Sequence, residues 1–171
     1  ALGATTTGTF NVGVGRNALT ANTTGGSNVA VGGQALDANT SGGNNTAVGT
    51  SSLGANTTGA SNVAVGQACL AGNTTGTNNV MVGTGAGDAI TTSNNNTGIG
   101  HDVLGANTSG DTNTAMGSTT LNTNTTGAGN TGIGYAALTA NTTGDLNTAV
   151  GSSALDSNTT GEVNVGLGVN A

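Results

Sequence analysis

The sequence contains no proline, no lysine and no tryptophan, and it has one phenylalanine, Phe10, and one tyrosine, Tyr135. Asn, Thr and 33 Gly make up much of the chain instead. A chain with so few large apolar side chains cannot build the core of an ordinary globular domain. Composition by itself would place this sequence among the low-complexity, disordered segments.

Positive charge is almost absent. Arg16 is the only cationic side chain, and seven acidic residues give a net charge of −6. Binding to nucleic acid depends on basic side chains that neutralise phosphates, and adsorption to anionic lipid needs the same side chains. We therefore expect no nucleic-acid partner. No apolar run approaches the roughly 20 residues of a membrane-spanning helix, so we expect no membrane insertion either.

The chain has a single cysteine, Cys69, so it contains no disulfide framework. No group of residues in the sequence predicts catalysis. His101 and Asp102 are the only histidine–carboxylate neighbours, and they occupy two variable positions of the repeat described below. The acidic residues recur too irregularly for a calcium-binding roll, whose loops need carboxylates at fixed offsets. We expect no enzyme activity, no cofactor and no metal site.

What the sequence does have is a strict period. The motif Asn-Val-Ala-Val-Gly at 62–66 returns, with small changes, every 17 residues, and its Asn stands at 11, 28, 45, 62, 79, 96, 113, 130, 147 and 164. Such a period is the signature of a repeat architecture. The sequence therefore predicts one array over residues 1–171. Because the array starts and ends inside a unit, we expect it to be a segment of a longer fibrous protein.

Numbered from this Asn, each unit contains two short alternating runs separated by Gly-containing turns. Positions 2 and 4 are predicted to face the interior and position 3 to face outward. In the second run, positions 9, 11 and 13 are predicted inside, and positions 10, 12 and 14 outside. Two strands and two turns per 17 residues predict an all-β fold, a parallel β-solenoid or β-roll of about ten coils. Stacked coils would align the Asn residues at positions 1 and 12 into hydrogen-bonded ladders.

Position 3 carries Gly or Ala in nine of the ten copies. On an outer strand face, such a column of small residues predicts close approach by another chain. We therefore expect a homo-oligomer, a side-by-side trimer or an end-to-end filament. The predicted inter-chain face consists of Ala30, Ala47, Ala64, Ala115 and Ala149.

Positions 12 to 14 form an Asn-x-Thr/Ser sequon in eight copies. If they face outward, these amides can accept glycans; the alternative is a structural Asn–Thr ladder. The eight residues are Asn22, Asn39, Asn56, Asn73, Asn107, Asn124, Asn141 and Asn158.

One copy, at 79–95, breaks the pattern. Gly87 replaces the usual Leu at position 9, Ile90 replaces Asn at position 12, and Ser93 replaces Gly at position 15. We expect Ile90 to fill the space that Gly87 leaves, within a locally altered coil.

The motif Asn-Thr-Ala-Val-Gly at 45–49 and 147–151 resembles repeats in the heads of trimeric autotransporter adhesins, which form left-handed parallel β-rolls that associate as trimers. The longer unit at 147–161 is similar to repeats of phage tail-fibre-like proteins. This resemblance implies a fibre, a trimer and an extracellular, cell-surface or virion location. A cell-surface glycan or receptor is the partner that such a context implies.

The expected function is therefore that of a structural, non-catalytic fibre or surface-filament segment that supports attachment. The alternative is an ice-binding β-solenoid, because a flat, Thr-rich and weakly charged surface suits ice. In the predicted arrangement, however, outward Thr at position 14 pairs with Asn at position 12 and not with a second Thr.

Overall fold

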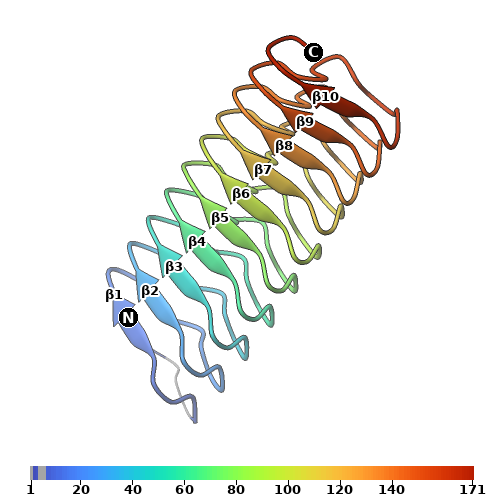
Figure 1. Cartoon of the computed structure of the whole chain (residues 1–171). Coiled ribbons are helices and arrows are strands. Elements are labelled where there is room, and N and C mark those ends of the chain that lie inside the picture. The colour runs from blue at the N-terminus through green and yellow to red at the C-terminus, as the bar shows by residue number, and fades with distance from the viewer. Residues whose placement is uncertain (1, 4–6) are drawn as a thin grey trace.

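The computed structural model describes residues 2–3 and 7–171, and in this part of the chain it contains ten short strands and no helix. The strands form one parallel sheet in chain order, and each strand pairs in register with the strand 17 residues further on. Figure 1 shows the result, a straight stack of coils with one strand per coil. The predicted parallel β-solenoid with 17-residue coils is confirmed. The strands are β1 (Val12–Val14), β2 (Val29–Val31), β3 (Thr46–Val48), β4 (Val63–Val65), β5 (Val80–Val82), β6 (Thr97–Ile99), β7 (Thr114–Met116), β8 (Thr131–Ile133), β9 (Thr148–Val150) and β10 (Val165–Leu167).

Each coil has one strand, at positions 2 to 4, and not the two that the sequence predicts. The second alternating run forms turns, because its Leu at position 9 adopts a left-handed backbone, with φ of 50° at Leu53. A residue with positive φ cannot continue a strand. The side chains at positions 11 and 13, predicted inside, are half-buried or exposed.

The interior face of the strand is also the reverse of the prediction. The residue at position 3 points inward, and Ala30, Ala47, Ala64, Ala115 and Ala149 are completely buried within their own chain. The prediction that they form an inter-chain face is therefore wrong. They are small because the coil is narrow: a Cβ added to Gly132, which also stands at position 3, would lie 2.7 Å from Thr120 Cγ2 across the interior.

The Leu residues at position 9 form the main apolar column of the core, as predicted. Leu19, Leu36, Leu53, Leu70, Leu104, Leu121 and Leu138 are completely buried, and the mostly small residues at position 8 line the wall beside them. Each Leu backbone is tied to the next coil; the amide of Leu53, for example, donates to the carbonyl oxygen of Cys69 at 2.9 Å. Core packing and coil stacking are thus achieved by the same residues.

Two asparagine ladders run along the rod, as predicted. At position 1, the amide N–H of Asn45 donates to Asn28 Oδ1 (2.9 Å), and its Nδ2 donates to the carbonyl oxygen of Gly59 (2.8 Å). At position 12, Asn56 Nδ2 donates both to Asn39 Oδ1 (2.8 Å) and to the same Gly59 oxygen (3.0 Å). The Gly carbonyl at position 15 is therefore the point at which the two ladders meet.

The fifth coil, residues 79–95, compensates for its missing Leu. A Cβ on Gly87 would lie 3.0 Å from Ile90 Cδ1 and 3.2 Å from Met81 Cγ, so both side chains occupy the space of the absent Leu. The predicted role of Ile90 is confirmed, and Met81 at position 3 shares it. Figure 1 shows the coils continuing in line through β5.

This substitution interrupts the ladder of position 12. Ile90 has no side-chain amide to donate to the fourth coil, and Asn73 Oδ1 is the one buried side-chain oxygen or nitrogen without a hydrogen-bond partner in the described part of the chain. Towards the sixth coil the amide of Thr91 reaches Thr108 O at only 3.4 Å, against 3.0 Å for the equivalent bond from Thr108 to Thr125. The fifth coil therefore lacks one hydrogen bond to the fourth coil and has a longer one to the sixth coil, so it is joined less firmly to both neighbours than the other coils are.

Candidate interaction surface

The side chains at positions 2 and 4 of every strand point away from the interior, because successive side chains of a strand lie on opposite faces. We call these two columns the outer sheet face. Val65 is 36% exposed and Ile99 is 43% exposed, whereas the intervening residues at position 3 are buried. The outer sheet face consists of Val12, Val14, Val29, Val31, Thr46, Val48, Val63, Val65, Val80, Val82, Thr97, Ile99, Thr114, Met116, Thr131, Ile133, Thr148, Val150, Val165 and Leu167.

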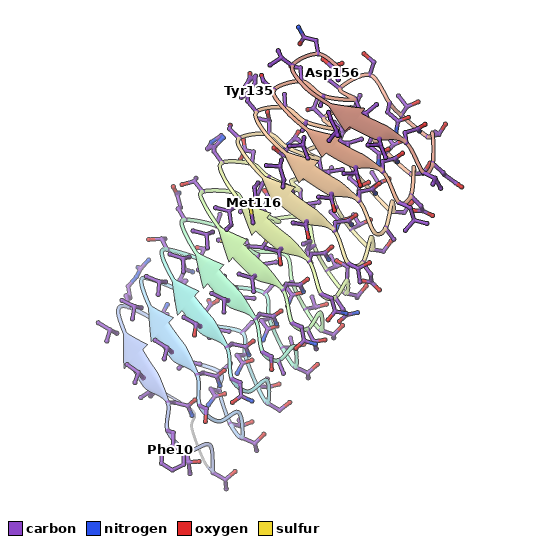
Figure 2. The ribbon with its side chains drawn as sticks, in the orientation of Figure 1. Phe10, Met116, Tyr135 and Asp156 are labelled. Carbon is purple, nitrogen blue, oxygen red and sulfur yellow. The ribbon has the colours of Figure 1, made fainter. Side chains whose placement is uncertain are left out.

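The outer sheet face is apolar and carries no charge. Position 4 is aliphatic or Met in all ten strands, and position 2 is Val in five and Thr in five. The seven acidic residues all lie at other positions of the unit. Figure 2 shows exposed aromatic rings beyond the two ends of the strands, Phe10 before β1 and Tyr135 after β8.

The backbone holds these columns in a regular lattice. Beside each strand the amide of position 2 donates forward to the next coil, as from Val63 to Asn79 O (2.8 Å). The amide of position 5 donates back to the preceding coil, as from Gly66 to Val48 O (2.8 Å). The same distance of about 2.8 Å recurs at equivalent rungs along the sheet. The outer sheet face is therefore a rigid, repeating surface and not a mobile loop.

Gly at position 5 makes this close stacking possible. Gly66 has a φ of +143°, and a Cβ added to it would collide with the carbonyl group of Gly83 in the next coil. Residues other than glycine rarely adopt this backbone conformation. The invariance of Gly at position 5 in the ten copies follows from this contact.

The sequon asparagines are not at the surface. Seven of the eight, from Asn22 to Asn141, are completely buried, and Asn158 is partly buried. In six of the eight, Nδ2 donates both to the preceding asparagine and to a Gly carbonyl oxygen, as it does in Asn56 and Asn141. A glycan on Nδ2 would replace one of the Nδ2 hydrogens and would not fit inside the coil. The outward, glycan-accepting arrangement is therefore wrong, and the structural ladder describes these residues.

The one histidine–carboxylate pair and the one cysteine lie in different coils. His101 Nδ1 is 3.3 Å from Asp102 Oδ2, and both side chains are exposed to solvent. Cys69 is buried with its Sγ donating to Met81 O at 3.2 Å. Burial raises the pKa of the Cys69 thiol to about 12, so the thiol is protonated at neutral pH. In residues 2–3 and 7–171 there is no pocket and no group of three metal-ligating side chains.

Comparison with protein-family models, with curated proteins and with solved structures found no match to this chain. Among the described residues, no helix is long and apolar enough to cross a membrane. The outer sheet face remains the candidate functional surface, and sequence reasoning missed it by assigning its side chains to the core.

Proposed function

We propose that this chain is a structural, non-catalytic rod, a segment of a fibre or surface filament that supports attachment. One observation carries the proposal: each coil is joined to the next by backbone hydrogen bonds and by at least one asparagine ladder over the whole stack. Ten coils spaced at about 4.8 Å give a rod on the order of 48 Å long.

Such a rod is suited to holding two ends apart. In a solenoid, each repeat contacts only its neighbours, so length grows with repeat number while the cross-section stays constant. The attachment partner is then bound elsewhere in the fibre, and the repeats act as a spacer. A cell surface or virion, with a cell-surface glycan or receptor as the final partner, is the setting that we propose.

Electron microscopy of tandem arrays tests the rod function. Residues 11–163 comprise nine whole units, so arrays of two and four such blocks continue the period without interruption. We expect straight particles whose length grows by about 43 Å per block, from nine spacings of about 4.8 Å, at constant width. Particles that bend freely between blocks, or that widen as blocks are added, would contradict a rod.

Ice binding is the second candidate, and the orientation of the strands favours it more than the sequence did. The outer sheet face is uncharged and repeats in every coil, and position 2 is a β-branched residue, Val or Thr, in every strand. Thr occupies only five of the twenty positions on this face, however, and none at position 4. Thermal hysteresis of the purified chain at micromolar concentration would favour ice binding over the rod function.

A further inference from the structure

The outer sheet face is an apolar surface that runs the whole length of the rod. We propose that it binds a second copy of this chain, so that two rods pack sheet face against sheet face. This inference rests on the proposed rod function and names its immediate partner. It also moves the self-association surface from position 3, which is buried, to positions 2 and 4.

The size of the face fits a weak pair. Ten strands spaced at about 4.8 Å and three residues wide cover roughly 48 Å by 10 Å, or about 500 Å² per chain. This is within the roughly 300–600 Å² of the largest apolar patch on a typical monomer, a patch that is often functional. Two such faces together reach the roughly 1,000 Å² that a specific interface needs. We therefore expect dimers that dissociate on dilution.

The residues at position 4 favour a protein partner over ice. Their side chains are apolar in every coil but differ in shape: Val, Ile at Ile99 and Ile133, Met at Met116, and Leu at Leu167. To match the lattice of ice, the face would have to present side chains of the same shape in every coil. A protein partner can instead change the rotamers of its own side chains to fit neighbours of different shape. Met in particular fills irregular gaps. The side chains at position 4 are thus alike in being apolar and are not alike in shape.

The repeat itself identifies the partner as another copy. Side chains of two flat sheets interdigitate when their rungs have the same spacing along the stack, as in dry interfaces between paired sheets. A second copy has the same spacing along its full length. The face also carries no charge, so pairing leaves the acidic residues of both chains, with a net charge of −6 each, outside the contact. One flat face per rod is covered completely by one partner, so we propose a pair.

Sedimentation equilibrium from about 1 μM to about 1 mM, the range in which such a small interface dissociates, tests the pairing. The disrupting variant is Val65→Lys/Ile99→Lys/Ile133→Lys on the outer sheet face. The matched control is Thr75→Lys/Ser109→Lys/Thr143→Lys, which adds the same charges to exposed position 14 of the same three coils. We expect the unaltered chain and the control to dimerise, and the disrupting variant to associate at least tenfold more weakly.

A second variant covers the case in which three lysines prevent folding. Val65→Thr/Val82→Thr/Ile99→Thr keeps β-branched side chains, and hence strand propensity, while it lowers apolarity. We expect this variant to fold and to dimerise severalfold more weakly than the unaltered chain. Equal dimerisation of the Thr variant and the unaltered chain would overturn the proposal.

Three other outcomes would also overturn it: a chain that stays monomeric up to about 1 mM, where an interface of this size should form; a trimer or an open filament; and thermal hysteresis that the Thr variant retains and the Lys variant loses. The last outcome would identify ice as the ligand of this face. The tandem-array lengths do not depend on pairing, so failure of the pair leaves the rod function to be judged separately.

Discussion

At the scale of single residues, position 9 shows how burial and backbone strain are combined. Leu138 has a φ of 52°, in the left-handed region that bulky residues rarely adopt. It is nevertheless completely buried, and its amide donates to Ala154 O at 3.0 Å. The burial of a large apolar side chain and the bond between coils offset the cost of the backbone conformation.

Leu138→Asp should therefore unfold the coil. The loss should exceed the roughly 2–5 kcal/mol of a buried Leu→Ala change, because a charge is also buried without a partner. Thr139→Asp, at the adjacent outward position, should change the free energy of unfolding by about 0.5 kcal/mol or less, apart from mild repulsion by Asp156 one coil further on. Chemical denaturation of both variants measures the difference, and equal effects would mean that position 9 is not the core.

The reversed faces of the strand predict a second pair of substitutions. Ala64→Gln places a long polar side chain in the narrow interior, where overpacking alone costs about 1–3 kcal/mol and the buried amide adds to this. Val65→Gln, on the outer sheet face, should cost no more than about 1 kcal/mol of β-propensity. Thermal denaturation at a concentration at which both variants are monomeric compares them. A more harmful change at Val65 would restore the orientation predicted from the sequence.

The Cys69 thiol predicts a pH dependence. Burial raises the pKa of this thiol in the folded chain to about 12, from an ordinary value of 9.0. The folded state therefore holds the thiol proton more tightly, and this contribution to stability is complete below about pH 9 and is lost as pH rises towards 12. The free energy of unfolding should fall in this window, and Cys69→Ala should show a shallower decline. Identical slopes for the two proteins would contradict the burial of the thiol.

At the scale of one coil, the fifth unit shows what the sequence revealed and what it concealed. The pairing of Gly87 with Ile90 was predictable, because a lost Leu and a gained Ile lie three residues apart. The role of Met81 was also encoded, since the one large residue at position 3 occurs in the one complete copy that lacks the Leu. The occurrence of Met81 in the coil that lacks the Leu indicates that position 3 points inward. The alternation of side chains alone, in a strand of three residues, does not show which face is buried.

Restoring the common unit in this coil should stabilise the rod. The variant Met81→Ala/Gly87→Leu/Ile90→Asn/Ser93→Gly returns a donor to Asn73 Oδ1 and a Leu to the core. Gly87 already has the φ of +61° that this Leu would need. Satisfying a buried acceptor is worth about 1–3 kcal/mol, and we expect a gain of that order in denaturant titration.

Ile90→Asn alone separates the two effects. It restores the donor but leaves a cavity beside Gly87, so it should destabilise the chain although the fourfold variant gains. If the changes in unfolding free energy of the four single variants add up to that of the fourfold variant, the shared cavity is contradicted. Substitutions of residues that fill one space have non-additive effects on stability.

At the scale of the whole molecule, the period, the solenoid, the Leu column and the asparagine ladders were predictable from the sequence. They depend on residue types that recur at a fixed spacing, and stacking converts that spacing directly into columns. The number of strands per coil was not predictable, and the inner face of the strand was indicated only by Met81 in the fifth coil. They depend on where the backbone adopts positive φ, as Leu at position 9 does, and on the width of a coil that only the folded structure reveals.

The interrupted ladder at the fifth coil has a consequence for a rod under load. A force that pulls the two ends apart passes through every junction in series, so the rod fails at the junction with the fewest and longest bonds. Between the fifth and sixth coils the position-12 ladder lacks its asparagine acceptor, so Asn107 Nδ2 donates to Ser93 Oγ at 3.4 Å, and the bond from the amide of Thr91 to Thr108 O is also lengthened to 3.4 Å. Rupture should begin there and leave two shorter stacks, each still joined by its own position-1 asparagine ladder.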